Sequence, residues 1–125
     1  MQDPVTEKFL VLKRSDYGKD AGLRDLIGGQ VNFGEDARDA LRREGQEETG
    51  LLLEEMFPLD VHSRLFTEDR WFIFTLRVCD AFTGEIQLSE EHTEFARVDG
   101  DELLSLPMRD TVERVKPIIA SYAQE

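Results

Sequence analysis

Runs of apolar residues, bounded by polar or glycine-containing turns, predict strands along much of the chain. The runs "VHSRLF" and "WFIFTLRV", separated by the polar "TEDR", are typical of a β-hairpin. The acidic segment "SEEHTE" at residues 89–94 has the composition of a loop. The predicted strands cover residues 9–14, 23–29, 61–66, 71–78, 84–88 and 95–98.

Helices are predicted in two parts of the chain. Residues 35–50 begin with two acidic side chains and end at Gly50, which are common start and stop signals. "DGDELLSLP" predicts a helix start, and apolar residues recur at helical spacing over residues 109–125. Pro117 should kink or split that last helix near Lys116. This element order predicts an α/β (α+β) fold with a mixed β-sheet sandwiched between helices.

Length and charge narrow the class of protein. The 125 residues, 40% of them hydrophobic, fit a single domain over residues 1–125. The net charge of -12 argues against a nucleic-acid partner and against an anionic membrane surface. The lone Cys79 excludes an intrachain disulfide. With no signal-like start and no membrane-length apolar stretch, these features predict a cytoplasmic protein.

The segment "RREGQEETG" at residues 42–50 is a poor helix by local criteria. Glu44, Glu47 and Glu48 share one helical face, where like charges repel. Gly45 adds a cost of roughly 1 kcal/mol relative to alanine. The same face begins with the apolar Ala37, Ala40 and Leu41, so the carboxylates continue a packing surface. A divalent cation such as Mg²⁺ or Mn²⁺ would neutralise them; the alternative is a solvated acidic face.

The surrounding residues favour the cation. Residues 29–51 read "GQVNFGEDARDALRREGQEETGL" and resemble the signature of the Nudix hydrolases. The matching positions are Gly29, Glu35, Arg43, Glu44, Glu47, Glu48, Gly50 and Leu51. Gly45 departs from the pattern, because the family has a bulky aliphatic residue there. If an aliphatic pocket lies beneath it, Gly45→Leu or Gly45→Val should be tolerated.

The resemblance implies an activity and a set of roles. Nudix hydrolases cleave a diphosphate linked to another moiety, by water attack at phosphorus with Mg²⁺ or Mn²⁺. The implied metal ligands are the carboxylates of Glu44, Glu47 and Glu48 and the main-chain carbonyl of Gly29. Arg43 would orient the glutamates, with an ordinary i,i+4 ion pair as the alternative. Glu35 would fix the loop before the helix or reach the metal through water; the alternative is an acid favoured by the helix dipole.

The general base and the substrate contacts lie outside this motif. The base is a helix glutamate in some family members and a loop glutamate in others, and Glu91 best matches the loop position. Its alternative is a solvated acidic loop, and His62 and His92 are interpreted as incidental. Arg14 and Arg70 are candidate phosphate contacts, and Phe33 is a candidate stacking surface for a base.

The implied substrate is a small nucleotide. The chain lacks the downstream signatures of family members that act on ADP-ribose, dinucleoside polyphosphates or NADH. A nucleoside triphosphate, including a damaged one, is therefore favoured, followed by a nucleotide sugar. The resemblance also implies a homodimer. Two other interpretations are a Nudix-fold domain that binds a nucleotide without hydrolysing it, and an acidic cation-binding or protein-interaction domain.

Overall fold

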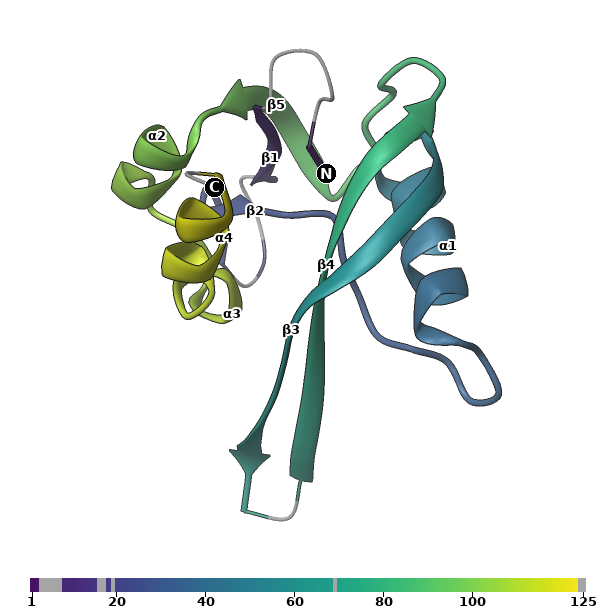
Figure 1. Ribbon diagram of the computed structural model, residues 1–125, viewed down its shortest axis with the longest axis vertical. Coiled ribbons are helices and arrows are strands. Elements are labelled where there is room, and N and C mark those ends of the chain that lie inside the picture. The colour runs from purple at the N-terminus through teal and green to yellow at the C-terminus, as the bar shows by residue number, and fades with distance from the viewer. Residues whose placement is uncertain (3–7, 16–17, 19, 69, 124–125) are drawn as a thin grey trace.

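The computed structural model describes residues 1–2, 8–15, 18, 20–68 and 70–123. Figure 1 shows strands in the middle of the molecule, with one long helix on one side and several short helices on the other. The strands are β1 (Phe9–Arg14), β2 (Arg24–Asp25), β3 (Leu52–Thr67), β4 (Arg70–Thr83) and β5 (His92–Val98). The helices are α1 (Ala37–Thr49), α2 (Gly100–Ser105), α3 (Asp110–Glu113) and α4 (Lys116–Ala123).

Strand β1 separates two hydrophobic cores. It pairs antiparallel with β2 on one side and with β5 on the other. Because successive side chains of a strand point to opposite faces, its apolar run supplies both cores. Phe9 and Val11 pack with residues of α2, α3 and α4. Leu10 and Leu12 pack with the start of β3 and with Cys79 of β4. The predicted strand at residues 9–14 is therefore confirmed, and burial on both faces explains its continuous apolar sequence.

The hairpin of β3 and β4 is longer than predicted. Its pairing runs from Leu52 opposite Thr83 to Thr67 opposite Arg70, so all of "LLLEEMFPLD" after its first leucine belongs to the first strand. The far half of the ribbon extends beyond the rest of the molecule in Figure 1. The predicted strand at residues 84–88 is wrong, because this segment bonds to the end of α1 through Gln87 N–H and Thr49 O at 2.7 Å. Strand β5 begins at His92, inside the predicted loop.

The predicted break in the last helix is confirmed. Residues 109–125 form two short helices in the described part, and Pro117 lies in the first turn of α4, where its missing N–H costs nothing. Val112, Val115 and Ile119 are buried in the core next to β1, as their spacing predicted. No helix among the described residues is long and apolar enough to cross a membrane.

Gly45 has no empty pocket beneath it. A Cβ atom built on this buried residue would lie 2.7 Å from Leu53 Cδ1 and 3.0 Å from Leu53 Cγ. Leu53 is 1% exposed, so its side chain has little room to move. The condition under which leucine or valine would be tolerated at this position, an aliphatic pocket beneath it, is therefore not met. Leu53 on the adjacent strand already fills the space that an aliphatic side chain of the helix would take.

Candidate functional site

Helix α1 carries the acidic motif and is capped at both ends. The Asp36 carboxylate caps its first turn by accepting a hydrogen bond from Arg38 N–H at 2.8 Å. Gly50 ends the helix in the left-handed conformation, with φ of 76°, which glycine adopts without strain. Glu44 and Glu48 point toward the glycine loop before the helix, and Glu47 is more exposed.

Arg43 joins the helix to that loop. Its guanidinium donates to both carboxylate oxygens of Glu35, at 3.0 and 3.2 Å, and to the main-chain oxygen of Gln30 at 2.9 Å. It also contacts Glu44 at 2.8 Å and Glu47 at 3.3 Å. Hydrogen bonds from Arg43 hold the pKa of Glu35 below its usual value. The geometry fits the predicted orienting role of Arg43, and it makes Glu35 the residue that anchors the loop.

Glu44 lies directly against Gly29. A Cβ atom on Gly29 would overlap the Glu44 carboxylate, so only glycine leaves room for it. Gly28, the preceding residue, has open space where its Cβ would be. The two adjacent glycines therefore differ sharply in what they permit.

Gly29→Ala is expected to lower kcat/KM by about 100-fold, because it displaces Glu44 from the loop by an ångström or more. Gly28→Ala is the matched control, since it adds the same methyl group one residue away without a clash. Both variants keep the Gly28 main-chain N–H. Steady-state kinetics and thermal unfolding of the pair test this, and equal activity of the two variants would contradict it.

Glu48 is the most buried carboxylate of the motif. It is 3% exposed, and both its oxygens accept from the main-chain N–H of Gly28 at 3.3 Å. Burial, with a smaller contribution from the neighbouring Glu44, Asp25 and Glu91 carboxylates, raises the pKa of Glu48 to about 8 against the opposing Gly28 hydrogen bond. Without a cation, this side chain is therefore mostly protonated at neutral pH. Such a perturbed, buried acid is typical of a functional site.

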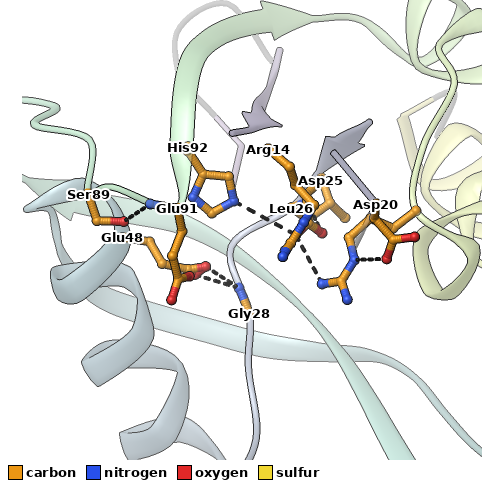
Figure 2. Close-up of polar contacts among 10 residues, drawn as sticks. Arg14, Asp20, Asp25, Leu26, Gly28, Glu48, Ser89, Glu91 and His92 are labelled. Carbon is orange, nitrogen blue, oxygen red and sulfur yellow. Dashed lines mark hydrogen bonds and ion pairs between the residues drawn. The ribbon is translucent and has the colours of Figure 1, made fainter. Parts of the chain in front are cut away.

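The segment before β5 brings Glu91 and His92 to Glu48 (Figure 2). Ser89 N–H donates to Glu48 O at 3.1 Å, and Ser15 N–H donates to Glu91 O at 2.9 Å. These bonds attach the segment to the end of α1 and to the end of β1. As a result, ligand atoms of Glu48, Glu91 and His92 all lie within 4.8 Å of one another.

Asp25 lies on the other side of His92. Its carboxylate contacts Arg109 at 3.2 Å and Arg14 at 3.4 Å, and accepts from Leu26 N–H at 2.8 Å. Burial alone would raise the pKa of Asp25, but the nearby His92 ring, Arg109 and the Leu26 N–H outweigh it and hold the pKa below its usual value. Asp25 is therefore a buried, ionised carboxylate next to the cluster.

The structure brings some predicted site residues together and leaves others apart. Glu44 lies against Gly29, and Glu48 accepts from Gly28 N–H. Glu91 lies beside Glu48, whereas the Glu47 side chain is 59% exposed. Arg14 is engaged with Asp25. Phe33 is fully exposed in the loop before α1. The side chain of Arg70 lies outside the described residues.

Sequence reasoning missed Asp25 and misjudged His92. His92 was interpreted as incidental in an exposed loop, but it is 4% exposed at the start of β5. Its place in "EEHTEF", beside the predicted base, was the available signal. Asp25 had no such signal: it stands in a short segment predicted as a strand, just before the motif, and matches none of the motif's fixed positions.

The donor set fits a hard divalent cation. Carboxylate oxygens suit Mg²⁺ and Mn²⁺, and an excess of buried negative charge needs a positive partner. Gly29 leaves the close approach that a side chain would block. With such a cation bound, the arrangement could neutralise and orient an anionic group such as a phosphate.

The chain matches the Nudix domain family over residues 2–120. The protein belongs to the Nudix family. It is 32% identical over 107 residues to the nucleoside triphosphatase NudI of Escherichia coli, covering 77% of this chain and 76% of that protein. The resemblance at residues 29–51 is thus extended to most of the chain.

Solved structures of Nudix proteins share the fold. A MutT Nudix hydrolase from Burkholderia pseudomallei superposes with a TM-score of 0.77 at 24% identity, covering 95% of this chain and 91% of that one. The E. coli ORF135 protein gives a TM-score of 0.79 at 25% identity, covering 91% and 80%. The predicted family, α/β fold class and hydrolase assignment are confirmed. This Nudix hydrolase is an enzyme of a family that generally uses divalent metal ions.

Proposed function

We propose that this Nudix hydrolase is a Mg²⁺- or Mn²⁺-dependent pyrophosphohydrolase of nucleoside triphosphates. The observation that carries the proposal is the convergence of Glu44, Glu48 and Glu91 around the Gly28–Gly29 loop, with Arg43 fixing the loop to the helix. The relation to NudI, named as a nucleoside triphosphatase, favours a triphosphate over a nucleotide sugar.

We assign the residues the roles that the family resemblance implies, where their positions are compatible with them. Glu44, Glu47, Glu48 and the main-chain oxygen of Gly29 would hold the cation, which supplies charge neutralisation for the diphosphate and activation of water. Arg43 orients the carboxylates, and Glu35 holds the loop that carries Gly29. Glu91, exposed beside Glu48, would accept the proton of the attacking water. Phe33 and Arg70 stay candidate substrate contacts, and a homodimer and a cytoplasmic location stay predictions.

Arg14 receives a different role. Its guanidinium forms an ion pair with the Asp25 carboxylate at 3.4 Å. We therefore assign it to the support of the site and expect phosphate contact from it only if the ion pair opens.

A substrate panel tests the proposed function. Nucleoside triphosphates, their oxidised forms, nucleotide sugars and ADP-ribose are compared by kcat/KM with Mg²⁺, with Mn²⁺ and with a chelator. We expect a nucleoside triphosphate to give the highest value, a metal requirement, and nucleoside monophosphate plus pyrophosphate as products. Nucleotide binding without turnover of any compound would instead support a non-hydrolytic binding domain.

A further inference from the structure

His92 is a buried polar side chain that lacks hydrogen-bond partners among the described residues. It is 4% exposed, and neither ring nitrogen has a hydrogen-bond partner among the described residues. Burying an imidazole without partners is costly, because its bonds to water are lost and not replaced. A buried imidazole without partners that lies close to other potential metal ligands indicates a ligand site. His92 lies in such a cluster with Glu48 and Glu91.

The ring lies between two sets of carboxylates (Figure 2). Its Nε2 is 3.8 Å from the Asp25 carboxylate, which is longer than a hydrogen bond but close enough to orient the ring. Asp25 is itself fixed by Arg14, Arg109 and the Leu26 N–H. The ring edge that carries its nitrogens also faces the space beside Glu91 and Glu48 in the close-up. A carboxylate behind a histidine is the usual support of a metal-binding imidazole.

We propose that His92 gives an imidazole nitrogen to a cation that it shares with Glu48, next to the Glu91 carboxylate, and that Asp25 orients its ring. The proposal rests on the proposed function for the presence of a cation, and adds a nitrogen donor to an otherwise oxygen-based site. Imidazole is a ligand of first-row transition metals more than of Mg²⁺, and Mn²⁺ is the first-row transition metal of the proposed function. The enzyme should therefore bind Mn²⁺ with a preference over Mg²⁺ that depends on His92.

Pulsed electron paramagnetic resonance of the protein with Mn²⁺ alone tests the nitrogen ligand directly. We expect a ¹⁴N coupling typical of a directly bound imidazole, and its replacement by a ¹⁵N coupling when only the histidines carry ¹⁵N. The measurement needs no variant and no turnover. Bound Mn²⁺ without a directly coordinated nitrogen would overturn the proposal.

The two histidines of the chain provide a matched pair of variants. His92→Gln should remove the nitrogen coupling and weaken Mn²⁺ binding by about 10- to 100-fold, with a smaller loss for Mg²⁺. His62→Gln should change neither, because His62 lies on β3 and contacts Asp60 at 3.1 Å. Titration calorimetry gives both affinities, and thermal unfolding verifies that the variants fold. Unchanged Mn²⁺ affinity and coupling in His92→Gln would contradict the assignment.

The outcomes separate this inference from the proposed function. Hydrolysis of nucleoside triphosphates without a nitrogen coupling would overturn the role of His92 alone. A histidine-dependent coupling without hydrolysis of any nucleotide would support the ligand and overturn the proposed activity.

Discussion

Glu48→Gln is expected to lower kcat on the order of 1,000-fold, the scale seen when a charge-stabilising group is removed from an active site. Glutamine keeps the size of the side chain and an oxygen that can accept from Gly28 N–H, so the fold should survive. It loses the negative charge with which, in the proposed function, Glu48 would hold a cation beside Glu44 and Glu91. We therefore expect kcat and the affinity for the metal ion to fall together.

The same substitution should stabilise the metal-free protein at high pH. Because burial raises the pKa of Glu48 to about 8, the folded protein keeps a proton that the unfolded chain loses above about pH 4.5. The contribution of Glu48 to stability is therefore greatest below pH 4.5 and falls by roughly 1.4 kcal/mol per pH unit between pH 4.5 and 8. Above pH 8, the ionised Glu48 should lower the free energy of unfolding by a total on the order of a few kcal/mol. Glu48→Gln should remove this loss.

Chemical denaturation in the presence of a chelator, at pH 5, 7 and 9, measures this effect as the difference between wild type and variant. Asp39→Asn is the matched control on the same helix, because Asp39 is exposed and pairs only with Arg42 among the described contacts. It should leave turnover and the pH dependence unchanged. A Glu48→Gln enzyme with normal turnover, or with a stability difference that does not grow from pH 5 to pH 9, would contradict the role given to Glu48.

The local part of the site was predictable because it depends on helical spacing. Arg43 and Glu47 are four residues apart on α1, and the interval between Gly29 and Glu44 is fixed by the motif. Turn chemistry likewise predicted the end of α1 at Gly50 and the break before Pro117. Each of these features is decided by residues that are neighbours in the sequence.

The rest depends on contacts between distant segments. Asp25, Glu48 and His92 meet only because β1 pairs with both β2 and β5, and because the segment before β5 bonds to the end of α1. No periodicity in the sequence encodes such a meeting, so His92 looked incidental. The hairpin was underestimated for a related reason, since Pro58 and the acidic residues in "LLLEEMFPLD" obscure the strand pattern.

Gly45→Leu should destabilise the protein by about 3 kcal/mol, although leucine is a better helix former than glycine. The gain in helix propensity is about 1 kcal/mol, whereas the new side chain must enter space held by the buried Leu53. Gly45→Ala adds only the Cβ atom, which lies 2.7 Å from Leu53 Cδ1. The cost of this close contact and the gain in helix propensity should nearly cancel, so the free energy of unfolding should change little. Denaturant unfolding of the metal-free proteins at one pH measures both values.

A double-mutant cycle then tests whether Leu53 is the cause. Leu53→Ala alone should cost about 3 kcal/mol through the cavity it leaves. If the two side chains compete for one space, Gly45→Leu combined with Leu53→Ala should be less destabilised than the sum of the single variants by about 2 kcal/mol or more. Additive costs would mean that leucine at this position clashes elsewhere. A double variant that is less destabilised than the sum would mean that the two side chains compete for one space. In this protein Leu53 of β3 then occupies the space that an aliphatic side chain of the helix occupies in other family members.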